Sequence, residues 1–173
     1  MPGFWLATLM LLWLSLALRW LPSIGYVPLL ENPVDNLRHL IMPVIGLGLP
    51  LAATIMRFAR SSLLEVYNQD YIRTANAKGL SRRQVTLGHA LKNALIPVIT
   101  VAGIQVGRLL GGAVIVEQIF ALPGLGRYVY DAISTRDYPV LQGTVLVFTV
   151  VFILVNLLVD IIYGFVDPRI KLA

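Results

Sequence analysis

Long apolar runs divide this sequence and restrict what it can fold into. Four segments approach the roughly 20 apolar residues that a helix needs to cross a bilayer, and they cover residues 4–21, 40–57, 94–116 and 140–166. The chain is 57% hydrophobic and only 13% charged, unlike a water-soluble domain. Because backbone polar groups in lipid must bond within the chain, we expect helical spans in an all-α integral membrane protein, with residues 1–173 as one transmembrane domain.

The spans carry different local signals. Residues 4–21 end in Arg19 and Trp20, a pair that suits a membrane interface because Arg can reach water and Trp anchors at the headgroups. Pro43 and Pro50 interrupt the second span. We therefore expect a bend or a locally unwound stretch there.

Small and polar residues mark the faces of the last two spans. Gly103, Gly107 and Gly111 are four apart and share one helix face, which predicts either close helix packing or a place on a transport pathway. Asn156 and Asp160 are also four apart on one face. Because polar groups are costly in lipid, that face should look into protein or water.

Charges inside the spans need partners. Arg108 lies deep in the third span, where it either reaches an interface or an acidic partner, or contacts substrate. Asp160 is nearer the inner surface, and we expect it to pair with Arg57 or Arg60.

One polar island, residues 57–92, separates the second and third spans. It holds seven of the 14 Lys and Arg residues against Glu65 and Asp70, so its net charge of +5 equals that of the whole chain. The links at 19–39 and 117–139 lack such an excess. The positive-inside rule therefore predicts a cytoplasmic loop at 58–93 and a cytoplasmic C-terminus. Since this charge lies beside the membrane, we expect no nucleic-acid partner.

Local signals in the island predict two helices joined at Gly79-Leu80. Gly79 can take a left-handed C-terminal cap, and Ser81 with Gln84 fits a capping box. The first helix is predicted over Asp70–Lys78, with Asp70 as its N-cap. A helix this short is marginal unless it packs against something, so it either lies on the lipid surface or docks on a partner.

Several motifs carry a resemblance to a known family. They are DYIRTANAKGLS (70–81), HALKNALIPV (89–98), GGAVIVEQIFALPGLG (111–126), RDYPVLQG (136–143) and NLLVDIIYGFVDPRI (156–170). The sequence resembles permease subunits of binding-protein-dependent ABC importers in the dipeptide, oligopeptide and nickel family over residues 4–170. Arg73-Thr74-Ala75 stands where the general loop signature has Glu-Ala-Ala, as in the peptide subfamily.

The resemblance implies a MetI-like permease core in the bacterial inner membrane, with four transmembrane helices and short cytoplasmic coupling helices. It implies three protein partners besides the lipid bilayer: ATP-binding subunits, a second permease subunit and an external substrate-binding protein. The cargo would be peptides, or nickel and other small solutes. The residues implied in contact with the ATPase are Asp70, Tyr71, Arg73, Ala75, Ala77, Lys78 and Gly79, and those implied in the outward loop are Glu117, Pro123, Gly124 and Gly126.

Two other classes stay open. Permeases of this family are usually considerably longer, with two spans and an outward segment before the part that begins here, so we expect an N-terminal truncation, a split gene or a remainder supplied separately. An inactive fragment is therefore one alternative. The other is an ATP-independent channel or secondary transporter, which would suit Arg108 and Asp160 but predicts inverted repeats that the sequence does not show.

Nothing in the sequence suggests catalysis or a cofactor. It has no G-x-x-x-x-G-K-[ST] loop for nucleotide phosphates, so ATP hydrolysis would fall to partner subunits. Neither His39 nor His89 has a metal-ligand partner at helical spacing, and the chain has no cysteine. We expect a transport subunit that is not itself an enzyme and that holds no metal.

Overall fold

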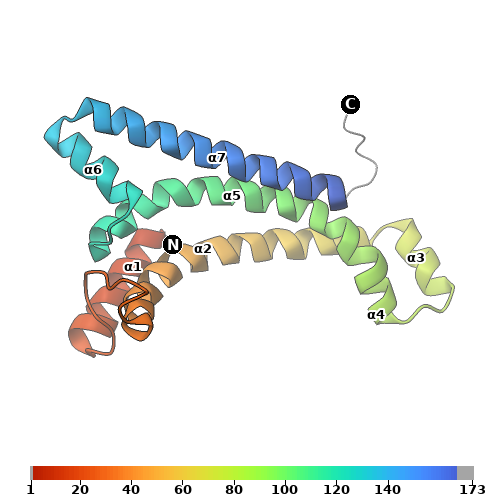
Figure 1. The fold of residues 1–173 in the computed structure, drawn as a ribbon. Coiled ribbons are helices and arrows are strands. Elements are labelled where there is room, and N and C mark those ends of the chain that lie inside the picture. The colour runs from red at the N-terminus through yellow and green to blue at the C-terminus, as the bar shows by residue number, and fades with distance from the viewer. Residues whose placement is uncertain (1, 167–173) are drawn as a thin grey trace. The chain divides into compact units, whose positions relative to one another are not determined.

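The computed structural model describes residues 2–166, and each element in that part is helical (Figure 1). This confirms the expected all-α class. The predicted cytoplasmic tail, residues 167–173, lies outside the described part. In chain order the elements are α1 (Gly3–Met10), the π-helix η1 (Leu11–Ala17), α2 (Pro33–Tyr67), α3 (Asp70–Ala77), α4 (Arg82–Gln84), the π-helix η2 (Val85–Ala90), α5 (Leu91–Phe120), α6 (Leu125–Thr135) and α7 (Tyr138–Val166).

Within the described part, three helices are long and apolar enough to cross a membrane, so the predicted count of four is not confirmed. They are Pro33–Tyr67, Arg82–Leu109 and Tyr138–Val159. The first expected span forms helix only over Gly3–Ala17, which at ~1.5 Å per residue rises about 22 Å against a ~30 Å hydrocarbon core. The helix stops there because the chain turns at Arg19, whose φ is 55°.

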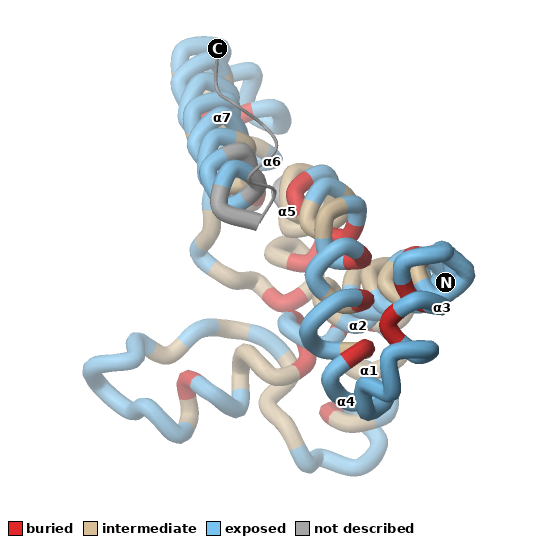
Figure 2. The backbone as a smooth tube through the Cα atoms, turned by 90° about the vertical axis from the view of Figure 1, so that its right-hand side faces the viewer, coloured by how far each residue is buried: buried red, intermediate tan, exposed pale blue. Residues whose placement is uncertain are grey.

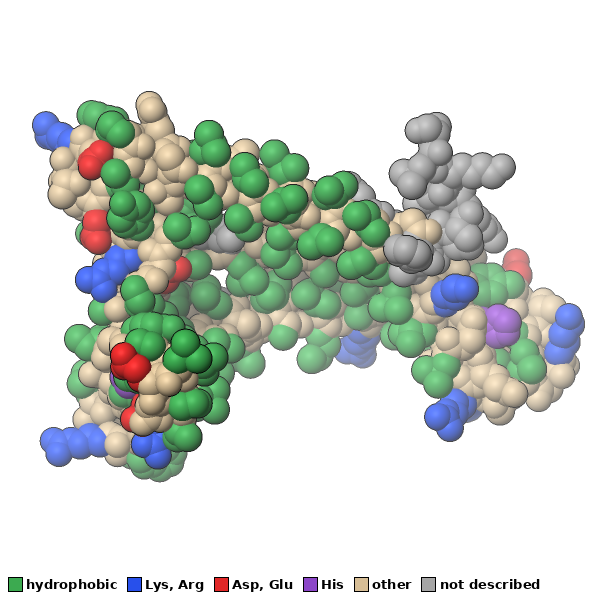
Figure 3. Space-filling model, viewed as in Figure 1, with side chains coloured by type: hydrophobic (Ala, Val, Ile, Leu, Met, Phe, Trp, Pro, Cys, Tyr) green, Lys and Arg blue, Asp and Glu red, His purple; other side chains and the backbone are tan. Residues whose placement is uncertain are grey.

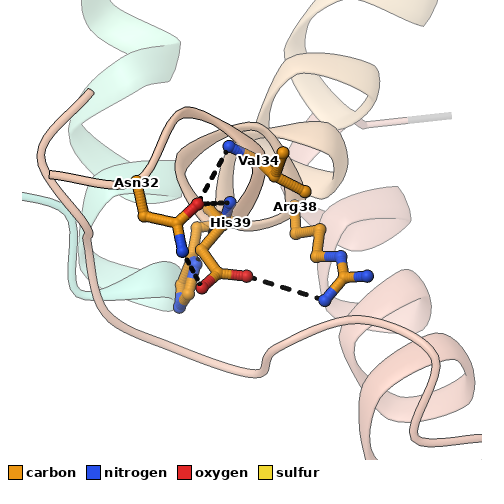
Figure 4. A network of polar contacts seen from close by, with 5 residues as sticks. Asn32, Val34, Arg38 and His39 are labelled. Atoms are coloured by element: carbon orange, nitrogen blue, oxygen red, sulfur yellow. Dashed lines mark hydrogen bonds and ion pairs between the residues drawn. The ribbon is translucent and has the colours of Figure 1, made fainter. Parts of the chain in front are cut away.

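The long helix α2 begins at a cap that the hydropathy pattern does not reveal (Figure 4). Asn32 Oδ1 accepts hydrogen bonds from the backbone N–H groups of Val34 and Asp35, both at 3.2 Å, and Asn32 Nδ2 donates to Asp35 Oδ2 at 2.7 Å. Pro33 occupies the first helical position, where its missing N–H is harmless. The Asn-Pro-x-Asp signal therefore starts this helix seven residues before the apolar run.

The helix α2 continues through Pro43 and Pro50 instead of unwinding. Pro50 has no N–H, so it leaves the carbonyl of Gly46 without its usual intrahelical donor. Gly3 of α1 lies against that carbonyl, and a Cβ built at Gly3 would be 2.8 Å from the oxygen. A Cβ at Gly46 would be 2.9 Å from Ala7 Cβ. The small residues thus let α1 approach α2 closely.

The chain forms two compact units, each with its own apolar core. Among the described residues, the first unit comprises 2–52 and 107–152, and the second comprises 53–106 and 153–166. The core of the first unit is built from Ala7, Met42, Val116 and Phe120. The core of the second unit is built from Ile72, Ala75, Val85 and Ala90. The second core anchors the short helix α3.

Most of α7 is exposed along its length (Figure 2). Only 6% of its most apolar window is buried within the chain, although the mean hydropathy of that window is 2.3. A large uncovered apolar surface of this kind is unstable in water and suits lipid or another helix. The helix therefore has the surface of a membrane span.

Candidate functional site

The site centres on α3, the short helix between two of the span candidates. Its N-cap is Gln69, whose backbone is extended, and no side chain caps the helix. The prediction that Asp70 is the N-cap is therefore wrong by one residue, because the backbone of Asp70 is already helical. In the first turn, the negative charge of Asp70 interacts favourably with the helix dipole. Asp70 Oδ1 lies 3.4 Å from Arg73 Nη1.

The predicted left-handed cap at Gly79 is confirmed. Gly79 has φ +79°, its N–H donates to the carbonyl of Asn76 at 3.0 Å, and the N–H of Leu80 donates to the carbonyl of Ala75 at 3.4 Å. These two bonds form a Schellman motif, which satisfies carbonyls at the end of α3. The motif fixes the direction in which the chain leaves the helix.

The predicted capping box after this turn is also confirmed. The N–H of Ser81 donates to Gln84 Oε1 at 3.0 Å, and the N–H of Gln84 donates to Ser81 Oγ at 3.4 Å. The helical chain then continues from α4 through η2 into α5. The two predicted helices are thus present, and the second leads directly into a span candidate.

The inner face of α3 is part of the core of the second unit. Ile72 is 1% exposed and Ala75 is 7% exposed, and both pack with Val85 and Ala90. Ala75, predicted to contact a partner, thus has its methyl group against its own chain. Ile72 and Ala75 are three residues apart, so they lie on the same face of the helix, and this is the buried face.

The outer face of α3 is free of the core and carries charge. Tyr71, Arg73, Ala77 and Lys78 are all exposed. Figure 3 shows Lys and Arg side chains gathered around α3 and α4 on the face in view. The ion pair of Arg73 with Asp70 is solvent-exposed, and such pairs contribute little to stability. These charges therefore remain available to a partner.

Two open hollows flank α4 and η2. One of about 500 Å³ is lined by Leu80, Arg83, Gln84, Leu87, Gly88 and His89. The other, of about 300 Å³, is lined by Tyr67, Asn76, Arg82, Val85 and Thr86. The lining of each hollow includes apolar side chains, polar side chains and one arginine.

Three hydrogen bonds in the second unit were not expected from the sequence. The buried hydroxyl of Ser62 donates to the carbonyl of Ala94 at 2.9 Å. The hydroxyls of Tyr67 and Thr86 lie 2.5 Å apart, and Asn93 Nδ2 donates to the hydroxyl of Tyr71 at 3.0 Å. These side chains pair residues far apart in sequence, so no local pattern signals them.

The glycines of α5 lie in different surroundings. A Cβ built at Gly103 would be 2.9 Å from Val159 Cγ2, and one at Gly107 would overlap the ring of Phe152. Both glycines therefore let α7 approach α5. Gly111 faces open space in the described chain and has no helix against it.

The polar residues of the spans are only partly described. Arg108 is exposed on α5 and Asn156 is half-buried on α7, and neither is without an interaction partner. The side chain of Asp160, with its expected pairing, lies outside the described residues.

Glu117 lies in the last turn of α5, not in the predicted loop. The helix extends past residue 116 because Val116 and Phe120 belong to the first core. Glu117 Oε2 accepts a hydrogen bond from the N–H of Arg127 at 2.9 Å. Arg127 lies in the first turn of α6, where a negative charge interacts favourably with the helix dipole. Its carboxylate also contacts Gly124.

Glycine is required at the start of α6. A side chain at Gly124 would overlap the carboxylate of Glu117, and a Cβ at Gly126 would be 2.5 Å from Val114 Cα. An open hollow of about 670 Å³ borders this turn, lined by Pro123, Gly124, Leu125, Arg127, Tyr128 and Asp131.

The described residues offer no metal site. No group of three or more His, Cys, Asp or Glu side chains lies together in that part of the chain. His39 Nδ1 lies 2.7 Å from the carbonyl of Asp35, a local contact within α2.

Comparison with known proteins gives an independent finding. The family model described as "Binding-protein-dependent transport system inner membrane component" matches residues 1–172. The dipeptide transport system permease protein DppB of Escherichia coli is 56% identical over 140 residues, 81% of this chain and 41% of that protein. DppB of Alkalihalophilus pseudofirmus is 47% identical over 196 residues, 99% of this chain and 57% of that protein. The chain spans about half the length of the curated relatives it matches.

Proposed function

This chain belongs to the family of binding-protein-dependent transport system inner membrane components, and we propose that it serves as a permease subunit of an ATP-driven importer. Two of its relatives are named as dipeptide transport permeases, so peptides are the proposed cargo, ahead of nickel or other small solutes. The proposal assigns no chemical step to this chain, and ATP hydrolysis belongs to partner subunits.

The observation that carries the proposal is the construction of α3. Its inner face is buried under Ile72 and Ala75, its end is fixed by the Schellman motif at Gly79, and its outer face is exposed. A short polar helix held this firmly by its own chain does not need a lipid surface for stability. This favours docking on a protein over lying on the membrane.

The proposed contact surface for the ATPase comprises Asp70, Tyr71, Arg73, Ala77, Lys78 and Gly79, with Ala75 supporting it from behind. Arg73 and Lys78 would bond carboxylates or helix carbonyls of the partner, and the two hollows beside α4 and η2 would accept its side chains. Shifting a permease between two conformations, from a ratio of 1:99 to one of 99:1, takes about 5.5 kcal/mol of differential stabilisation. In this proposal, closure of two ATPase subunits on ATP supplies that free energy.

The proposed topology follows the charge. The loop 58–93 lies in the cytoplasm of a bacterial cell and the span candidates cross the inner membrane, as the basic excess of this loop predicts. The exposed apolar face of α7 meets lipid or the second permease subunit.

On the outward side we assign the substrate-binding protein to the 670 Å³ hollow at the start of α6. Pro123, Gly124 and Gly126 shape that turn, and Glu117 holds it by capping α6. Glu117 would thus support the docking surface without touching the binding protein.

The polar residues of the spans complete the proposal. Arg108, Asn156 and Asp160 are candidates for the translocation pathway. Gly103 and Gly107 serve close packing of α5 with α7. Gly111, which faces open space in the described chain, is left for approach by another helix of the assembly.

Co-purification with an ATP-binding subunit tests the function. Arg73→Glu combined with Lys78→Glu should lower ATPase capture at least about ten-fold, because two charge-assisted contacts are reversed. Arg136→Glu, which reverses one exposed charge at the C-terminal cap of α6, is the control for a reversed surface charge. Equal capture by the double variant and the control would remove the proposed docking surface.

A further inference from the structure

Asn93 connects three helical elements of the second unit. It lies in the first turn of α5. Its side-chain Nδ2 donates to the hydroxyl of Tyr71 on α3 at 3.0 Å and to the carbonyl of His89 in η2 at 3.0 Å. The amide has two N–H groups, so both bonds can exist at once. One side chain therefore joins α3, the π-helix η2 and α5.

This bond constrains α3 in a way that its apolar contacts do not. Ile72 and Ala75 hold the helix by burial, which is not directional and permits rolling or sliding. A hydrogen bond weakens steeply when its angle changes, so it fixes rotation as well as distance. Among the described residues, the bond from Asn93 to Tyr71 is the side-chain hydrogen bond that ties α3 to another element.

The neighbouring bonds anchor a different helix. Ser62 and Tyr67 belong to α2, and their partners are Ala94 and Thr86. They hold the end of α2 against η2 and the start of α5 but do not reach α3. Displacement of α3 relative to α5 is therefore opposed by Asn93.

We propose that Asn93 is the positioning residue that transmits movement of α3 to α5. The inference rests on the proposed function, in which a partner ATPase moves α3. It also revises the role of Tyr71, whose hydroxyl is bonded to Asn93 of its own chain although the residue is 42% exposed. A push on α3 is delivered through Tyr71 and Asn93 to the start of α5, next to the π-helix.

The first test needs no ATPase. The chain has no cysteine, so spin labels can be placed at Asn76→Cys and Lys92→Cys in the full chain in nanodiscs. Asn93→Leu, which has a similar size but no amide, should broaden the distance distribution between the labels. Ser134→Ala is the control because it removes only a bond to the carbonyl four residues back, at 2.9 Å. Equal widths in the variant and the control would overturn the proposal.

The second test measures transport in the reconstituted complex. Asn93→Leu should reduce substrate moved per ATP hydrolysed about two- to ten-fold, the change expected for one neutral hydrogen bond. Adding Tyr71→Phe should cause no further loss, since the bond is already gone. Asn93→Asp should restore much of the ratio, because the Tyr71 hydroxyl can donate to a carboxylate.

The outcomes separate the two proposals. If the wild-type complex captures no ATPase, the proposed function fails. If it couples normally while Asn93→Leu couples equally well, or while Asn93→Asp is as poor as Asn93→Leu, the role of Asn93 fails and the function stands.

Discussion

Substitution of Gly79 should loosen α3 through backbone strain alone. Its φ of +79° lies in the left-handed region, and a Cβ built there would meet nothing within 4 Å. A change to Ala therefore adds no clash. The cost is the conformational one, about 1–2 kcal/mol for an L-residue in this region, which corresponds to a ~5- to ~30-fold rise in local opening.

A series of substitutions at Gly79 should destabilise α3 to different degrees, in an order set by how well each residue tolerates left-handed backbone. Asn tolerates left-handed backbone several-fold better than other non-glycine residues, and β-branched residues tolerate it worst. We expect stability of α3 to fall from Gly79 through Gly79→Asn and Gly79→Ala to Gly79→Val. Hydrogen exchange of the amides at residues 72–80, measured by mass spectrometry in nanodiscs, reports this opening directly.

Gly88 supplies a control, because its change to Ala should raise stability whereas the change of Gly79 to Ala should lower it. Gly88 is exposed in the π-helix η2, also with nothing within 4 Å of a built Cβ, but without a positive φ. Gly88→Ala should stabilise the segment by up to about 1 kcal/mol, since Gly is a poor helix former. If Gly79→Ala leaves exchange unchanged, or if Gly79→Asn exchanges as fast as Gly79→Val, the strain argument is refuted.

Three further predictions concern packing and capping. Ile72→Ala removes a side chain that is 1% exposed, so it should cost about 2–5 kcal/mol in denaturant unfolding; a loss below 1 kcal/mol would contradict its burial. Glu117→Gln removes the charge at the start of α6 and should speed exchange of its first-turn amides about two- to five-fold, with no change expected in α3. Gly46→Val should clash with Ala7 and lower the Tm by an amount equivalent to about 1–3 kcal/mol, whereas Gly48→Val, with nothing within 4 Å, should have a smaller effect.

Local signals in the sequence were reliable where the cause is local. Gly79 and the pair Ser81 with Gln84 define a helix end and a helix start through atoms a few residues apart, and both motifs are present. Apolar runs likewise located α2 and α7, because burial in lipid depends on the length and composition of one segment.

The sequence did not indicate which residues distant in the chain pack against one another. Ala75 is buried because Val85 and Ala90 return to cover it, and an eight-residue pattern does not show which neighbours will come back. Glu117 remains helical because Phe120 is held in a core with Ala7 and Met42. Hydropathy also overestimated the first span, since it counts apolar residues and does not detect the turn at Arg19.

The exposed face of α7 has a consequence for how its sequence can vary. A side chain buried in a packed core must match a particular shape, and losing a methylene leaves a cavity. Little of α7 is buried in the chain, so exchanges such as Leu154→Ile or Leu158→Val create no cavity and should be nearly neutral. Replacement by Asp near the middle of the span would cost about 2.5–3.5 kcal/mol. Along this helix, the substitutions that are tolerated are limited by the need to remain soluble in hydrocarbon. Many different apolar sequences would therefore form an equally stable span.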